Sequence, residues 1–138
     1  MRISAHRIRK PRAGINVVEF AVVVPIFFLF VFGIIEIARG FMTTHLLTNA
    51  ARAGCRLGIL SGKSTDDIKT AVNTVLGQTI TGFTTTVTVN GKAVDASTAG
   101  SNDEISVVVS VPVADISWVP ASHYLNGNIA GRYSLRRE

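Results

Sequence analysis

The stretch from Gly14 to Arg39 reads GINVVEFAVVVPIFFLFVFGIIEIAR, and the rest of the chain is organised around it. From Phe20 to Ile35, sixteen consecutive residues carry neither a charge nor a polar side chain. With the apolar residues on either side, the segment reaches the roughly 20 residues that a helix needs to cross a bilayer. A core helix of a soluble protein is seldom apolar on every face for that length. We therefore expect residues 15–38 to form a transmembrane helix.

A short basic leader precedes this helix. Residues 1–14 contain five Lys or Arg, no acidic residue, and a glycine at the end. A secretory signal peptide also has a basic start and an apolar run, but its cleavage site of small residues follows that run. Here residues 36–39 (EIAR) follow instead, so we expect the apolar segment to be retained and any processing to occur before it. The positive-inside rule predicts a cytoplasmic N-terminus and a C-terminal domain outside the cytoplasmic membrane.

The remaining composition narrows the possible functions. The net charge of +5 comes entirely from residues 1–14, because the nine Lys or Arg that follow balance nine Asp or Glu. No basic stripe with interleaved aromatic residues follows, so the sequence predicts no nucleic-acid partner. A chain of 138 residues has room for one membrane helix and one small domain.

The start of the apolar helix carries a recognisable spacing. Gly14, four further residues and then Glu19 resemble the processing site of type IV pilins. The similarity continues through VEFA at 18–21, Pro25, FGIIE at 32–36, Arg39 and NAARAG at 49–54. Over about residues 14–60, these features resemble the N-terminal region of TadE-like pseudopilins, which are minor components of tight-adherence (Flp, type IVc) pilus systems.

This resemblance implies a processing step and an assembly role. A prepilin peptidase would cut between Gly14 and Ile15, and the Glu19 carboxylate could pair with the new N-terminal ammonium of a neighbouring subunit. Glu36 and Arg39 are further candidate assembly contacts, although residues three apart can also pair along their own helix. The implied partners are the membrane, the peptidase, other pilins or pseudopilins and the pilus assembly machinery. The implied protein is not an enzyme.

A second interpretation stays open from the residues alone. The chain could be an unprocessed single-pass membrane protein that displays a small binding domain outside the cytoplasmic membrane. Such an anchor would have no need of a carboxylate at Glu19, near hydrocarbon. A processed pseudopilin could instead be incorporated into the pilus.

Few other residues suggest chemistry. Cys55 is the single cysteine and stands where the family more often has a small or aliphatic residue. We expect it to pack as a small apolar group, with a disulfide to a second subunit as the alternative. The isolated histidines His6, His45 and His123 predict no metal site, and neither a cofactor nor a catalytic dyad is predicted. Trp118 and Tyr124 are expected to cover the core, with adhesive contacts as the alternative.

Beyond the span, residues 39–62 should extend the helix outside the membrane to about Leu57. Its polar stripe comprises Thr44, Thr48, Arg52 and Arg56. Its other face comprises Leu46, Ala50, Ala53, Gly54 and Leu57. Small residues at 50, 54 and 58 permit close approach of another backbone, and Gly58 or Gly62 should end the helix.

Residues 63–138 should form a small α+β domain. A short helix begins with a cap at Ser64 or Thr65 and closes at Gly77. Alternating residues then predict a strand up to Val89, and Asn90-Gly91 predicts a two-residue hairpin turn into residues 92–94. Residues 104–111 predict the most buried strand and residues 128–137 a closing one. The predicted fold is α+β: a long pilin-like N-terminal helix, a short helix and a three- to four-stranded antiparallel sheet.

Overall fold

The computed structural model describes residues 13–77, 79–118 and 127–138. The chain divides into two compact units with a boundary between Ile35 and Glu36, and each is described by itself. The helices are α1 (Ala13–Gly58), α2 (Thr65–Leu76) and α3 (Val113–Ile116), with a 3₁₀ turn η1 (Ala96–Thr98). The strands are β1 (Thr84–Val89), β2 (Glu104–Pro112) and β3 (Asn128–Arg136).

In the first unit, the turns of α1 are apolar on all sides and exposed. The helix continues through Pro25 without interruption. Most of its large apolar side chains lie on the surface, with exposed fractions between 43% for Ile35 and 73% for Leu29. The helix is long and apolar enough to cross a membrane, and none of its most apolar 18-residue window is buried within the chain. Because a core helix would be mostly covered, this exposure favours a membrane span.

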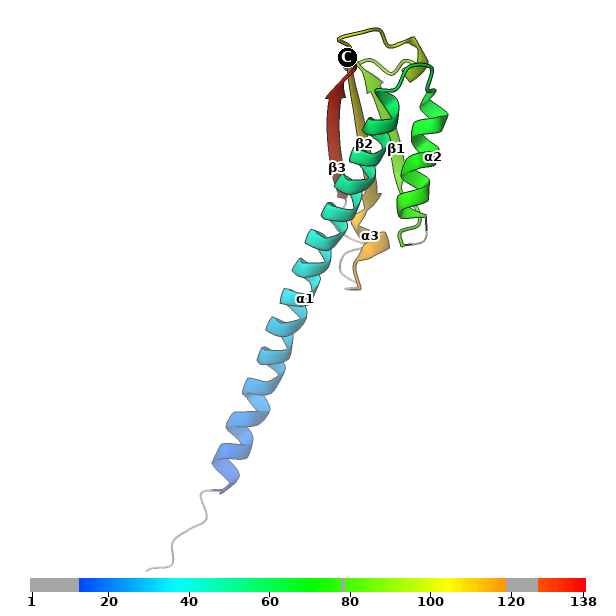
Figure 1. Cartoon of the computed structure of the whole chain (residues 1–138). Coiled ribbons are helices and arrows are strands. Elements are labelled where there is room, and N and C mark those ends of the chain that lie inside the picture. The colour runs from blue at the N-terminus through cyan, green and yellow to red at the C-terminus, as the bar shows by residue number, and fades with distance from the viewer. Residues whose placement is uncertain (1–12, 78, 119–126) are drawn as a thin grey trace, which may run out of the picture. The chain divides into compact units, whose positions relative to one another are not determined.

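In the second unit, three antiparallel strands form one sheet in the order β1-β2-β3. Figure 1 shows α2 and the last turns of α1 on the same side of this sheet. The odd-numbered residues of β2 face these helices and are buried: Ile105, Val107, Val109 and Val111. The prediction that residues 104–111 form the most buried strand is confirmed, since β2 is central. The α+β fold class is confirmed as well.

The core lies between the sheet and the two helices. Its helical members come from α1 (Leu47, Ala50, Ala51, Cys55) and α2 (Ile68, Val72, Leu76). Capping fixes the start of α2, because the Ser64 hydroxyl accepts from the Asp67 amide at 3.2 Å. The Asp67 carboxylate in turn accepts from the Ser64 amide at 3.0 Å. The predicted helix with a cap at Ser64 is therefore confirmed.

The buried face of α1 is wider than the sequence predicted. Ala50 and Gly54 are buried as expected, and Arg52 and Arg56 are exposed as expected. The face also includes Leu47, Ala51 and Cys55, whereas Leu46, Ala53 and Leu57 are only half-buried. The reason is that α1 contacts both α2 and the sheet, which together cover more of its circumference than a single neighbour would.

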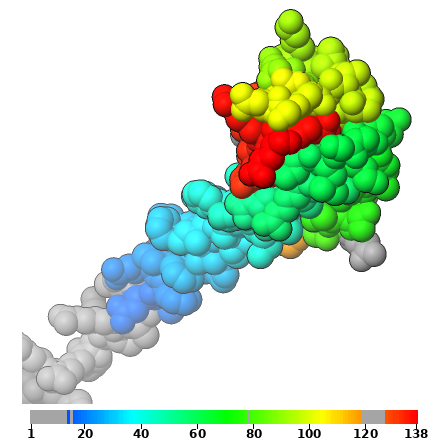
Figure 2. All heavy atoms as spheres, turned by 45° about the horizontal axis from the view of Figure 1, so that its top comes forward, coloured from blue at the N-terminus to red at the C-terminus, as the bar shows by residue number. Residues whose placement is uncertain are grey.

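Two glycines allow the closest contacts in this core. A Cβ at Gly58 of α1 would lie 2.8 Å from Ile68 Cδ1 of α2. A Cβ at Gly131 of β3 would lie 2.8 Å from Leu47 Cβ and closer still to the backbone of Leu47 and Thr48. Figure 2 shows β3 (orange to red) directly beside the later turns of α1 (teal to green). The small-residue track was predicted, but its partners are side chains of the same chain, and the backbone contact is at Gly131.

The predicted hairpin is only partly correct. Asn90 (φ 50°) and Gly91 (φ 76°) form the expected tight turn, and Val89 pairs with Lys92 in a single bridge. Residues 92–94 form no strand, however, and the ladder partner of β1 is β2. The Asn90 side chain explains this, because its amide donates to Asp103 at 2.7 Å and its carbonyl accepts from the Glu104 amide at 2.9 Å. These bonds hold the turn against the start of β2.

The end of β3 is held by a buried cation. The Arg137 side chain is 5% exposed and donates to the backbone carbonyls of Gly58 at 2.8 Å and Leu60 at 3.1 Å. It also donates to the carbonyls of Ala96 and Ala99. A guanidinium at the C-terminal end of α1 is favoured by the helix dipole. Arg137 thus joins three segments that are distant in sequence.

Candidate functional site

Gly14 and Glu19 lie on the first turns of α1, in the first unit. Both are exposed. They share a shallow apolar groove with Val18, Val22 and Val23, because residues three to five apart lie on neighbouring faces of a helix. Among the described residues, the Glu19 carboxylate has neither a hydrogen bond nor an ion pair. It is therefore available to a cation from outside the chain.

Glu36 and Arg39 belong to the second unit and do not pair with each other. Arg39 instead donates a hydrogen bond to the Ile116 carbonyl at 2.5 Å. Its guanidinium also lies over the Trp118 ring, 3.9 Å from the centroid. The pairing along the helix that the spacing allowed does not form, because a carbonyl and an aromatic face, 77 or more residues away in sequence, outcompete a partly solvated carboxylate one turn away.

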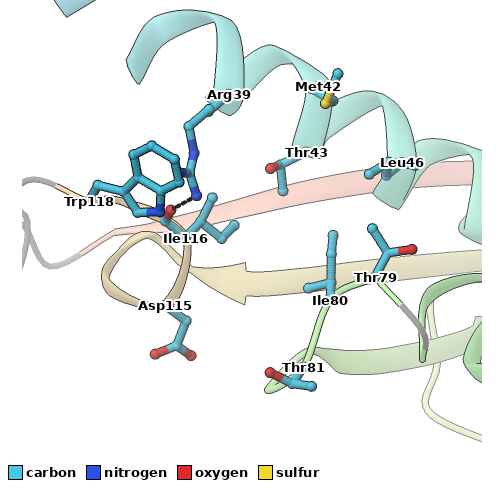
Figure 3. Close-up of a pocket in the computed structure, with 10 residues that line it drawn as sticks. All are labelled: Arg39, Met42, Thr43, Leu46, Thr79, Ile80, Thr81, Asp115, Ile116 and Trp118. Atoms are coloured by element: carbon cyan, nitrogen blue, oxygen red, sulfur yellow. Dashed lines mark hydrogen bonds between the residues drawn. The ribbon is translucent and has the colours of Figure 1, made fainter. Parts of the chain in front are cut away.

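Beside this contact lies a pocket of about 450 Å³ between α1, residues 79–81 and α3. We call it the Arg39–Trp118 pocket; it is lined by Arg39, Met42, Thr43, Leu46, Thr79, Ile80, Thr81, Asp115, Ile116 and Trp118. Figure 3 shows the Arg39 side chain extending toward Ile116 and Trp118, whereas the Asp115 carboxylate points away from it. This pocket was not predicted from the sequence, because its walls come from three segments that lie far apart in the chain.

Trp118 departs from its predicted role. It is 77% exposed, so it does not cover the core as expected. Its contact is the guanidinium of Arg39. The predictions for Tyr124, His123, His6 and residues 1–12 of the leader lie outside the described residues.

Cys55 lies inside the domain, as the packing prediction expected. It is 0% exposed, and its thiol donates to the Tyr133 carbonyl at 3.1 Å and more weakly to the Ile105 carbonyl at 3.7 Å. Burial raises the pKa of the Cys55 thiol from 9.0 to about 11. A neutral, enclosed thiol is a poor nucleophile, so a disulfide to a second chain would require the domain to open.

The described residues contain no group of three or more His, Cys, Asp or Glu side chains that could hold a metal ion. The three lowered carboxyl pKa values belong to Asp67, Asp95 and Asp103. Their largest causes are hydrogen bonds from the Ser64 amide, the Ser97 side chain and the Asn90 side chain, respectively. These carboxylates brace loops and helix ends of the domain.

Comparison with known proteins gives one match. Residues 14–56 match the family model described as TadE-like protein, which is the resemblance that the sequence indicated. The match covers the apolar part of α1 and most of its extension, and it indicates a protein associated with a tight-adherence (Tad) pilus. Neither the curated proteins nor the solved structures gave a match to the chain.

Proposed function

We propose that this chain, with its TadE-like N-terminal region, is a minor pilin-like subunit (pseudopilin) that supports assembly of a tight-adherence pilus. A prepilin peptidase removes residues 1–14, and Ile15 becomes the N-terminal residue. The mature helix stays in the cytoplasmic membrane with the C-terminal domain outside. The assembly machinery then takes the subunit up together with other pilins or pseudopilins.

The observation that carries this proposal is the exposed apolar surface that follows Glu19. Phe20 is 69% exposed and Leu29 73% exposed, and this face has no cover from the chain itself. Such a surface requires lipid or the apolar helices of neighbouring subunits. A pilin-like helix uses both environments in turn, first in the membrane and then in the assembly.

The Glu19 carboxylate supports the second of these environments, contact with neighbouring subunits in the assembly. A charged side chain at the centre of a membrane helix costs about 2.5–3.5 kcal/mol on insertion scales, and the Glu19 carboxylate and an N-terminal ammonium near the boundary each carry part of that penalty. Pairing of the Glu19 carboxylate with the Ile15 ammonium of a neighbour would offset both penalties. Within the described part of the chain Glu19 has no partner, which leaves it free for that role.

The test is pilus yield with Glu19→Gln and Glu19→Ala in a strain that depends on this chain. Both variants should enter the membrane and be cleaved, yet lose most piliation, because neither side chain supplies the charge. Glu104→Gln is the matched control, since Glu104 is an exposed carboxylate on β2 and its loss should leave piliation unchanged. Normal piliation with either Glu19 variant would remove the charge-pairing role and favour a simple anchor.

A further inference from the structure

The position of Arg39 along α1 can be related to the thickness of a bilayer. It is the first basic residue after the apolar run and follows Glu19 by 20 residues. A helix needs about 20 residues to cross the hydrocarbon core of a bilayer. In an inserted chain with Glu19 at the inner boundary, Arg39 therefore reaches the outer headgroup layer.

Trp118 is held at the same level by direct contact. The Arg39 guanidinium lies 3.9 Å from its ring centroid and also donates to the carbonyl of Ile116, two residues earlier. These two contacts hold Ile116 and Trp118 against α1. Trp118 is nevertheless 77% exposed, and Met42, which lines the same pocket, is 68% exposed.

The chemistry of Arg39 and Trp118 suits a lipid headgroup. An indole combines a large apolar body with one N–H donor, which is why tryptophan gathers at membrane interfaces. A guanidinium has five N–H donors, and the described residues accept one hydrogen bond from that of Arg39. The remaining donors match the oxygens of a phosphate, and Asp115, the one acidic residue among the described residues that line the pocket, directs its carboxylate away (Figure 3).

We propose that Arg39, Met42 and Trp118 form a lipid-binding face that rests on the outer phospholipid headgroups. Arg39 binds lipid phosphate, and Trp118 and Met42 enter the interface beside it. This inference rests on the membrane insertion of the proposed function. It adds that the domain itself touches the bilayer before assembly and must leave it when a subunit is extracted.

Trp118 provides its own probe, because it is the single tryptophan of the chain. The full chain would be reconstituted into phosphatidylcholine vesicles containing lipids brominated near the headgroup end or near the methyl end of the acyl chain. Trp118 fluorescence should be quenched strongly by the shallow bromines and weakly by the deep ones. Arg39→Gln should reduce the shallow quenching, since it removes the charge that binds phosphate.

The matched control moves the tryptophan to another surface of the domain. The double variant Trp118→Phe, Val94→Trp places it at an exposed site beside the loop that carries η1. It should show little quenching by either lipid. Insertion would be checked in parallel by resistance to alkaline extraction.

The outcomes distinguish failure of the lipid-binding face alone from failure of the proposed function. If the chain inserts but Trp118 is quenched no more than the relocated tryptophan of the double variant, the lipid-binding face is refuted and the proposed function stands. The lipid-binding face is also refuted if Trp118 is shielded only when chains crosslink to one another, because the face would then bind a second copy. Failure to insert would overturn both proposals.

Discussion

Gly131 of β3 lies directly against Leu47 of α1, so closely that a Cβ at Gly131 would stand 2.8 Å from the Leu47 Cβ. No side chain separates strand from helix at this point. The contact joins the part of the chain that matches the TadE-like family to the last strand of the domain. The C-terminal turns of α1 are thereby part of the domain core.

Gly131→Ala should destabilise the domain by about 1–3 kcal/mol or more, because the added methyl group meets backbone atoms that cannot move aside without separating β3 from α1. Denaturant unfolding of the full chain in detergent would measure the loss. Gly100→Ala is the control, since its Cβ would meet nothing nearer than Asp103 Oδ2 at 3.7 Å. Equal stability of the two variants would show that the strand does not approach the helix as described.

Arg137→Met should cost at least about 2 kcal/mol, because it leaves several buried carbonyls at the end of α1 and in the η1 loop without their donor. The expected readout is faster hydrogen exchange in these two segments, together with a lower unfolding midpoint. Arg136→Met provides the comparison, since Arg136 is the adjacent exposed arginine. Similar exchange in both variants would contradict the anchoring role of Arg137.

The Cys55 thiol should react with a maleimide only as fast as the domain opens. Burial and the raised pKa of about 11 keep the thiol neutral and enclosed at neutral pH. Denaturant should accelerate the reaction strongly, and non-reducing gels should show no dimer. A dimer band that disappears in Cys55→Ser would overturn the packed-thiol interpretation.

The same residue predicts a pH dependence at the alkaline end. The folded-state pKa of Cys55 lies above the unfolded value of 9.0, so its contribution to stability is complete below pH 9. That contribution should fall as the pH rises from about 9 to about 11, by up to about 3 kcal/mol. Cys55→Ala should lack this component of the fall. Parallel pH profiles for the two proteins would contradict it.

Much of the fold followed from local signals in the sequence. The apolar run, the cap at Ser64 and the valine-rich strand 104–111 each specify an element through its own residues, so α1, α2 and β2 were predicted with nearly correct ends. The extra strand at residues 92–94 was wrong because a turn signal says where the chain reverses, while the partner of β1 is chosen by long-range packing.

The tertiary contacts could not be predicted in the same way. Arg39 contacts Ile116 and Trp118, Gly131 contacts Leu47, and Arg137 donates a hydrogen bond to Gly58. Each pair is separated by 77 or more residues, and no periodicity links its members. Gly14 as a processing residue and Glu19 as an assembly residue could be proposed from the sequence alone, because their signal is a spacing within one helix start.

The most direct test of the proposed function is the intact mass of the protein extracted from membranes of cells that contain a prepilin peptidase. We predict a chain that begins at Ile15, with or without an N-terminal methyl group. Replacing Gly14 with leucine should block the cut and leave the longer form in the same cells. A wild-type mass that begins at Met1, or one that begins beyond residue 36, would contradict the proposed processing and the pseudopilin role that depends on it.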